Sequence, residues 1–174
     1  MRKLNLIKQL ICNKEYRTNF LIRKGFFDKM PDVKFIKKVY RIKLKKELDL
    51  DNPKSFNEKL QWLKLNDRRP EYTIMVDKYL VRDYIGKKLG NQYLIPLLGV
   101  WDSAEDIDFS LLPDEFVLKC NHNSGLGMCI CKDKKSLNIK KVKEGLTKGL
   151  AQDYYLEGRE WPYKNVQRKI VCEK

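Results

Sequence analysis

The 174-residue sequence has few of the features that mark secreted or membrane-spanning proteins. It has no long hydrophobic run: Asn, Lys and Gln interrupt the apolar positions of its basic opening, MRKLNLIKQLICNKEYR, so we expect neither a signal peptide nor a membrane span. It has one histidine and an odd number of irregularly spaced cysteines, which favours reduced thiols over secreted disulfides. These absences predict a cytoplasmic protein, with peripheral binding at the inner membrane surface left open. The cysteines are Cys12, Cys120, Cys129, Cys131 and Cys172.

Acidic residues are scarce in the first part of the chain. Residues 1–50 carry 15 Lys and Arg against 5 Asp and Glu, which accounts for +10 of the formal net charge of +14. Such a segment favours an anionic partner, such as a membrane surface, an acidic polysaccharide or a nucleic acid. Alternatively, the charges lie on solvated helix faces. Nucleic acid is the least expected partner, because the sequence lacks an RNA-recognition signature and its aromatic residues follow helical spacing.

Two segments of this basic part have helical periodicity. Residues 1–24 and the segment PDVKFIKKVYRIKLKKEL at 31–48 are predicted helices. In the second, lysines occupy the side opposite an apolar stripe formed by Val33, Ile36, Val39 and Tyr40. This amphipathic helix fits two positions, either packed on the domain or lying on an anionic membrane surface.

The next segment contains helix start and stop signals. Ser55 and Glu58 fit a capping box. A second helix is predicted over 70–90, between a proline that suits its first turn and a glycine that suits its end. Lys78 and Arg82 would share one face of this helix and could point at one anion. Its buried stripe is predicted to consist of Tyr72, Met75, Val76, Tyr79, Leu80 and Tyr84.

The rest of the chain is predicted to contain strands and one helix. YLIPLLGVWDS includes Pro and Gly, and fits an edge strand or an irregular connection. FVLKCNH and MCICKD predict a β-hairpin around NSGLG, residues 139–156 a helix, and RKIVCEK a last strand. This order indicates an α+β fold. The expected division is a basic helical region at 1–50, a helical linking segment at 51–112 and a hairpin-containing subdomain at 113–174.

The loop NSGLG is a candidate anion site. Gly125 and Gly127 allow positive φ angles and a close approach of backbone N–H groups to phosphate. The pattern matches neither a P-loop nor G-x-G-x-x-G, and an ordinary hairpin turn also explains it. Lys119 favours the phosphate hypothesis, because an ammonium group among apolar strand residues is costly unless it pairs with an anion. Alternatively, its stem packs while its amine reaches water.

Four side chains with sulfur or imidazole donors near the loop suggest an alternative, a metal site. Alternation along the strands places Cys120 with His122, and Cys129 with Cys131, on common faces that could converge on zinc. The spacing differs from the usual Cys-x-x-Cys knuckle, and cysteines in apolar strands are commonly inert core residues. No metal ligand is therefore assigned. His122 either hydrogen-bonds a phosphate or an acceptor, or stabilises the turn.

Three segments resemble, in order, three elements of ATP-grasp enzymes. MVDKYLVRDYI resembles their Asp-Lys element with a following Arg, EFVLKCNHNSGLGMCICKD their lysine strand and glycine-rich loop, and IVCEK the strand that ends in Glu-Lys at the adenine hinge. From about Asp49 onward, the chain resembles the TupA-like ATP-grasp family of teichuronopeptide and surface-polysaccharide biosynthesis, whose members are often labelled glycosyltransferases. The segments that carry this likeness are SFNEKLQWLKLNDR, YLIPLLGVWDS, LPDEFVLKCNHNSG and GREWPYKN.

The resemblance implies a helical N-terminal region followed by the first part of an ATP-grasp fold, namely a β-hairpin with a glycine-rich loop, a helix and a hinge strand. It implies that Lys78 and Lys119 approach the phosphates of ATP, and that Glu173 and Lys174 lie beside adenine or ribose. Lys78 as a surface residue and Glu173 as the ion-pair partner of a lysine are the structural alternatives. The flexible lid over the triphosphate would consist of Asn123, Ser124, Gly125 and Gly127.

The resemblance also implies an ATP-dependent ligase or transferase. A substrate carboxylate would attack the γ-phosphate of ATP, and an amine would capture the acyl phosphate, with a carboxylate-bearing sugar or peptide as acceptor. ATP and Mg²⁺ are implied, with the Mg²⁺ ligands expected beyond residue 174, so we expect a member truncated at the adenine hinge. No catalytic residue is assigned. The alternative function is a non-catalytic basic module that binds acidic polysaccharide, a membrane surface or nucleic acid through residues 1–50.

Overall fold

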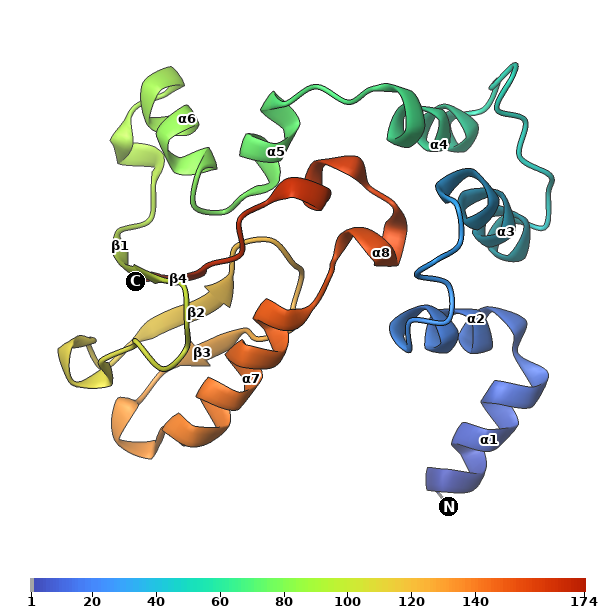
Figure 1. The fold of residues 1–174 in the computed structure, drawn as a ribbon. Helices are drawn as coiled ribbons and strands as arrows, with labels where there is room; N and C mark the ends of the chain where they lie inside the picture. The colour runs from blue at the N-terminus through green and yellow to red at the C-terminus, as the bar shows by residue number, and fades with distance from the viewer. Residues whose placement is uncertain (1) are drawn as a thin grey trace. The chain divides into compact units, whose positions relative to one another are not determined.

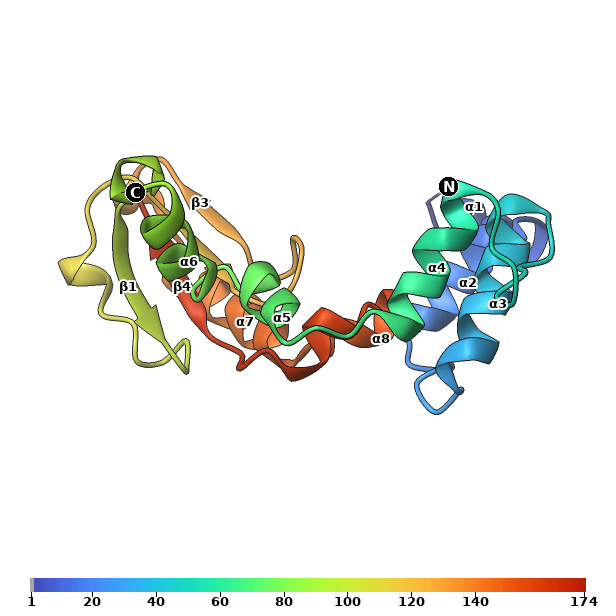
Figure 2. The same cartoon turned by 90° about the horizontal axis from the view of Figure 1, so that it is seen from above.

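The computed structural model describes residues 2–174, which form two compact units (Figures 1 and 2). Unit 1 consists of Met1–Arg68 and Tyr155–Trp161, and unit 2 of Arg69–Tyr154 and Pro162–Lys174. Each unit has a hydrophobic core of its own. The chain therefore enters unit 1 twice. The three-part division expected from the sequence remains a prediction.

Unit 1 is built from helices. Asn13 separates the first two, because its side-chain oxygen accepts a hydrogen bond from Tyr16 N (2.9 Å) and caps the second helix. The helix predicted over 1–24 is therefore two helices, and its first residue lies outside the described part of the chain. The helices of the unit are α1 (Arg2–Cys12), α2 (Lys14–Arg23), α3 (Asp32–Leu44), α4 (Phe56–Asn66) and α8 (Tyr155–Gly158).

The core of unit 1 forms around α3. Phe35, Ile36 and Tyr40 are buried together with Leu48, as expected for an amphipathic helix that packs on its own unit. Val33, which the periodicity assigns to the same stripe, is instead 44% exposed, because the buried side is centred on Phe35 and Ile36. Of the two positions that the sequence allows for this helix, the packed one is observed.

The predicted capping box at the start of α4 is confirmed. Ser55 Oγ accepts a hydrogen bond from Glu58 N (3.3 Å), and Glu58 Oε2 accepts one from Ser55 N (2.7 Å). These bonds, chiefly the one from the Ser55 backbone, hold the pKa of Glu58 below its usual value. They satisfy backbone donors that the first helical turn cannot satisfy by itself.

Arg159 ties the returning segment into unit 1. It has a positive φ of 52° and is 2% exposed. Its guanidinium carbon lies 4.7 Å from the ring centroid of Phe35 and 5.5 Å from that of Tyr155. Its Nη2 donates to the carbonyl oxygen of Phe27 (2.7 Å), and its Nε lies 3.6 Å from Asp32 Oδ1. This buried cation links the α8 segment to α3 and to the turn after α2.

In unit 2 the helix predicted over 70–90 is interrupted at Asp77. The Asp77 carboxylate accepts hydrogen bonds from Tyr79 N (2.8 Å) and Leu80 N (3.2 Å), and so stabilises a turn. The turn separates α5 (Glu71–Val76) from α6 (Val81–Lys88). A side-chain to backbone bond of this kind competes with helix continuation, which periodicity alone does not reveal.

The buried stripe predicted along this segment is therefore wrong. No residue of α5 or α6 in the described chain is buried, and Met75, Leu80 and Tyr84 are 42%, 41% and 39% exposed. Two short helices divided by a turn cannot keep these residues on one continuous face. The predicted start and stop signals of the segment are confirmed. Pro70 directly precedes α5, and Gly90, with a φ of 107°, follows α6.

The sheet of unit 2 has four antiparallel strands in the order β1-β4-β2-β3. The predicted hairpin and last strand are confirmed, and β1 is an edge strand, as its flanking proline and its glycine suggest. The helices and this small sheet confirm an α+β fold, whereas an ATP-grasp arrangement of the elements remains a prediction. The strands are β1 (Leu97–Trp101), β2 (Phe116–Cys120), β3 (Cys129–Cys131) and β4 (Ile170–Glu173).

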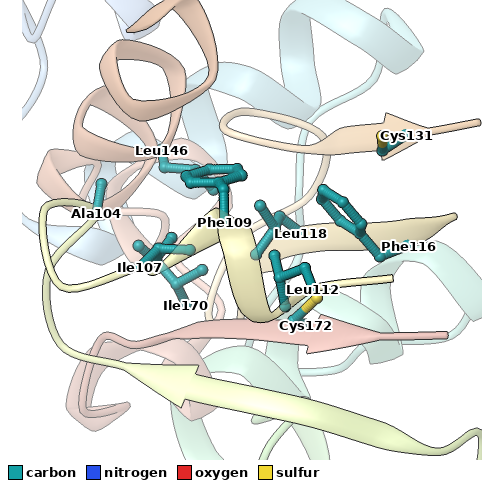
Figure 3. Close-up of a cluster of buried hydrophobic side chains, with 10 residues drawn as sticks. All are labelled: Ala104, Ile107, Phe109, Leu112, Phe116, Leu118, Cys131, Leu146, Ile170 and Cys172. Carbon is teal, nitrogen blue, oxygen red and sulfur yellow. The ribbon is translucent and has the colours of Figure 1, made fainter. Parts of the chain in front are cut away.

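One face of the sheet carries the core of unit 2 against α7 (Ile139–Ala151). Along β2, Leu118 is buried while its neighbour Lys119 faces the other side and is only partly buried. The helix predicted over 139–156 ends at Ala151, because the backbone at Gln152 is extended. Figure 3 shows the buried cluster, which consists of Ala104, Ile107, Phe109, Leu112, Phe116, Leu118, Cys131, Leu146, Ile170 and Cys172.

The remaining regular elements are short. In the part of the chain that the structure describes, no helix has the length and apolar character needed to cross a membrane. The cysteines are free thiols, as the odd count predicts. Short 3₁₀-helices cover Asn91–Tyr93, Phe109–Leu111, Lys134–Ser136 and Trp161–Asn165.

We predict that Arg159→Ala lowers the free energy of unfolding by about 3 kcal/mol, because it removes a buried ionic group and leaves backbone carbonyls without their donor. Urea unfolding followed by circular dichroism measures this loss. Arg168→Ala is the control, since Arg168 also donates to backbone carbonyls but its side chain is 39% exposed, and it should cost less than about 1 kcal/mol. Equal losses in both variants would contradict the role of Arg159.

We also predict one rapidly reacting thiol in the folded protein. Cys12 is exposed, whereas burial raises the pKa of Cys120 and Cys172 to about 11, so that at pH 8 about one in a thousand of these thiols is ionised. An aromatic disulfide reagent should react quickly with Cys12 only, slowly with the half-buried Cys129, and with the rest after unfolding in urea. Cys12→Ser should remove the fast phase. Fast labelling of Cys120 in the folded protein would argue against its buried position.

Candidate functional site

Five of the eight predicted site residues line one hollow of unit 2. The hollow has a volume of about 520 Å³. Lys78 reaches it from the turn between α5 and α6, and Lys119 reaches it from β2. Asn123, Ser124 and Gly125 contribute from the loop that follows β2. Three predicted residues are not part of its lining, namely Gly127, Glu173 and Lys174.

Lys78 is held at the base of the loop by backbone groups. Its Nζ donates to the carbonyl oxygens of Asn121 (3.2 Å) and Asn123 (2.5 Å), and its backbone N also donates to Asn121 O (3.2 Å). Lys78 is therefore more than a surface residue, because its amine joins the α5–α6 turn to both ends of a three-residue stretch of the loop. Burial, and after it the charge of Lys119, lower the pKa of Lys78.

Lys119 has an internal anionic partner. Its Nζ forms an ion pair with Glu173 Oε2, and Arg82 Nη1 lies 3.1 Å from Glu173 Oε1. The Glu173 side chain is 10% exposed. The anion that a lysine in this strand requires is thus the Glu173 carboxylate of β4. Arg82 also pairs with Glu173, so Arg82 and Lys78 do not point at one common anion as the sequence suggested. The other terminal nitrogen of Arg82, Nη2, donates to Ile95 O (2.6 Å).

Positive charge exceeds negative charge around the hollow. Lys78 and Lys119 are the charged side chains in its lining, whereas the carboxylates of Asp77 and Glu173, which interact with Lys78, are not part of the lining. Because the region is partly buried, this excess is screened less than it would be on an open surface. An anion in the hollow would offset it. The arrangement is therefore suited chemically to a phosphate group.

The glycine-rich loop is anchored at its two ends and exposed at its tip. Gly127 has a φ of 73°, and a Cβ there would lie 3.0 Å from Gly145 O and 3.1 Å from Gly149 Cα of α7. At the other end, the buried Asn123 side chain donates to Gly149 O (3.2 Å). Gly125 has a φ of 86° and open space around its Cα. The tip at 124–126 is the exposed part, and its movement as a lid remains a prediction.

Asp77 and Asn121 are site residues that the periodicity analysis missed. Asn121 is fully buried, and its Nδ2 donates to Asp77 Oδ1 (2.9 Å) and to Gln167 O (2.8 Å). Its Oδ1 accepts from Lys169 N (2.7 Å). These bonds tie the Asp77 side chain and the segment before β4 to Asn121, whose carbonyl oxygen accepts from Lys78. The Asp-Lys pair signals Asp77 in the sequence, whereas nothing local distinguishes Asn121 from an ordinary loop asparagine.

His122 stabilises the turn and does not line the hollow. Its Nε2 lies 3.0 Å from Gln152 O at the end of α7, and the ring is 2% exposed. Burial is the main cause that lowers the pKa of His122, which favours the neutral ring. Of the two roles left open by the sequence, the geometry favours the structural one.

The zinc hypothesis is wrong for the described residues, among which no three His, Cys, Asp or Glu side chains are grouped as metal ligands. Cys120 Sγ faces Leu146 O (3.7 Å), whereas Cys131 Sγ faces Asp114 O (3.4 Å), so the two thiols point at different parts of the backbone. No group of three carboxylates that could hold Mg²⁺ is present among the described residues either. No step of a reaction is therefore assigned to a metal here.

Glu173 is the last residue of β4, and Lys174 follows it beside the edge strand β1. Lys174 N donates to Pro96 O (3.1 Å), and Glu173 pairs with Leu97 of β1 in the sheet register. Glu173 thus serves as an ion-pair partner, which was its structural alternative, and a contact of either residue with adenine or ribose remains a prediction.

Comparison with known proteins identifies the family. Residues 58–174 match the family model described as TupA-like ATPgrasp, and this range contains every residue that lines the hollow. A search of curated proteins and a search of solved structures return no match. ATP-grasp proteins are nucleotide-binding proteins, in agreement with the cationic hollow. Because the match covers about two thirds of the sequence, the chain belongs to the TupA-like ATP-grasp family.

Proposed function

We propose that the hollow of unit 2 binds the phosphate tail of ATP. One observation carries the proposal: Lys78 and Lys119, from distant parts of the sequence, bring two ammonium groups to a single hollow with excess positive charge. Membership of an ATP-grasp family supports ATP as the nucleotide. A polyphosphate would supply negative charge to Lys78, whose amine contacts only backbone carbonyl oxygens among its hydrogen-bond partners in the described chain, and would share Lys119 with Glu173.

The ion pairs of Glu173 allow Lys119 to change partner. Lys119 contacts Glu173 in the structure, so its amine must turn toward phosphate, or share itself between the two anions, when nucleotide binds. Arg82 remains on the other oxygen of the carboxylate. Glu173 therefore keeps a counter-charge throughout, which avoids the cost of leaving a buried carboxylate alone. Lysine suits this exchange because its ammonium is a compact charge with three donors on a flexible stem.

The loop supplies backbone donors to the same anion. At Gly125 the positive φ and the open surroundings let N–H groups turn toward a phosphate without a Cβ in the way. Asn123 and Gly127 hold the loop on α7, so we expect only the tip at 124–126 to close over the phosphates. A loop with fixed ends loses less conformational entropy on closing than a free one.

The proposed reaction is the ATP-dependent activation of a carboxylate for ligation to an amine. A carboxylate oxygen forms a bond to the γ-phosphorus while the bond from that phosphorus to the bridging oxygen of ADP breaks, which gives an acyl phosphate. The amine then attacks the acyl carbon, loses a proton and displaces phosphate. Lys78 and Lys119 would stabilise the charge on the transferred group. Mg²⁺, when bound with ATP, would neutralise part of the charge on the phosphates, and no described residue is assigned to hold it.

The acceptor of this reaction is proposed to be a carboxylate-bearing sugar or peptide of cell-surface polysaccharide biosynthesis. The resemblance of residues 49–174 to a family of that pathway supports this class, as does the family match.

We predict that Lys119→Ala weakens the binding of tripolyphosphate and of ATP by about tenfold or more, because one of two ammonium groups that face the phosphates is lost. Isothermal titration calorimetry on the full chain measures both ligands. Lys132→Ala is the control, since it removes the same charge from the exposed end of the hairpin and should change the affinity by less than about twofold. Equal affinities of wild type and Lys119→Ala, or equal losses in the two variants, would refute the proposal.

We also predict that nucleotide binding takes up protons at alkaline pH. The pKa of Lys78 is lowered in the free protein, and a bound polyphosphate favours the charged amine and raises this pKa again. Between the two pKa values, part of a proton is bound with each nucleotide. Calorimetry at about pH 9 in two buffers of different ionisation enthalpy measures the uptake. Lys78→Arg stays charged and should abolish it, so undiminished uptake in this variant would exclude Lys78 as its source.

A further inference from the structure

α1 leaves two large apolar side chains uncovered on unit 1. Ile7 and Ile11 are 55% and 67% exposed, and a spacing of four residues places them on the same side of the helix. Isolated exposed apolar side chains are ordinary, but two in line on one helix face form a patch that a partner can cover. We refer to this patch, together with the neighbouring Lys8 and Lys14, as the α1 face.

The charge of the α1 face is positive. α1 contains Arg2, Lys3 and Lys8 and no acidic residue. Lys8 and the first residue of α2, Lys14, are both exposed. The nearest acid in the sequence is Glu15, which lies in the first turn of α2 where the helix dipole favours a negative charge. A partner of the α1 face must therefore be apolar in part and anionic in part.

α1 is fixed to the rest of unit 1 at its C-terminal end. Arg17 Nη1 donates to the carbonyl oxygens of Leu10 (3.3 Å) and Ile11 (3.0 Å), and Asn13 N donates to Gln9 O (3.0 Å). The last carbonyls of the helix thus have partners within the unit. What α1 offers to a partner is its side chains.

In α3, the other basic amphipathic helix of the unit, most of the apolar side already packs in the core. α3 places Phe35, Ile36 and Tyr40 in the core, so the centre of its apolar side is buried, and Val33 and Leu44 near its two ends are 44% and 40% exposed. In Figure 1, α2 lies between α1 and α3, which leaves α1 at the margin of the helical unit. The combination of basic and apolar character that residues 1–50 show as a sequence is therefore accessible at α1.

We infer that unit 1 docks on an anionic lipid surface through the α1 face. Ile7 and Ile11 enter the headgroup region, while Lys8 and Lys14 contact lipid phosphates. Cationic helices with one apolar side bind in this manner, with the apolar and the electrostatic contributions acting together. A second copy of the chain fits the face less well, because two α1 helices would bring like charges together. The inference does not depend on the nucleotide site, which belongs to unit 2.

Vesicle flotation tests this inference on the full chain. The vesicles contain phosphatidylcholine alone, or with about one third phosphatidylglycerol, in about 0.1 M or about 0.5 M NaCl. We expect binding to the anionic vesicles in low salt, binding to neutral vesicles that is about tenfold weaker or less, and a partial loss in high salt. Ile7→Glu/Ile11→Glu should weaken binding to the anionic vesicles by about tenfold or more.

Leu111→Glu/Ile130→Glu is the matched control. These two side chains are 82% and 60% exposed in unit 2, so the variant makes the same change of charge at similar apolar positions and should bind within about twofold of wild type. No binding of wild type to anionic vesicles, or equal losses in both variants, would overturn the inference. So would a wild-type dimer in sedimentation that Ile7→Glu/Ile11→Glu dissociates, because a second copy would then cover the face.

A charge variant keeps the test valid if the glutamates disturb the helix. Lys8→Gln/Lys14→Gln leaves the isoleucines in place and should weaken binding to anionic vesicles by about tenfold, since each basic residue near such a surface contributes to attraction. Lys140→Gln/Lys148→Gln, at exposed positions of α7, is its control. Equal binding by these two variants would contradict docking through the α1 face.

Discussion

The carboxylate of Glu173 is the group on which the charged side of unit 2 depends. It is largely buried at the end of β4 and accepts two cations, Lys119 from β2 and Arg82 from α6. Without the two cations the buried carboxylate would be costly, and without the carboxylate the two cations would repel each other. This one group thus links α6 and β2 to β4. Lys78 completes the cluster through backbone carbonyls instead of a carboxylate of its own.

Close backbone packing gives the loop a defined base. Gly149 and Gly127 approach so closely that a Cβ on Gly149 would lie 2.8 Å from Leu126 O and 2.7 Å from Cys120 Sγ. The loop therefore rests directly on α7, and its freedom is confined to a short tip. Together with the Asn123 side-chain bond, this packing anchors both ends of the loop on α7.

Much of the fold and part of the site could be predicted from the sequence. The hairpin, the last strand and the capping box of Ser55 depend on residues a few positions apart, and all were confirmed. Lys119 was recognisable because a lysine among apolar strand residues needs an anion. The identity of that anion was not recognisable, since Glu173 lies 54 residues away and becomes its neighbour through the pairing of β2 with β4.

By itself, the sequence determined the local elements, the α+β class and the basic character of residues 1–50, because these follow from propensity, periodicity and composition. Only the tertiary structure decided that Asn121 donates to Asp77, that Arg159 is buried on Phe35, and that α3 rather than α1 supplies the core of unit 1. In each case a contact with a residue far away in the sequence determines the result, and local sequence preference does not reveal it. Such contacts form only when the chain folds.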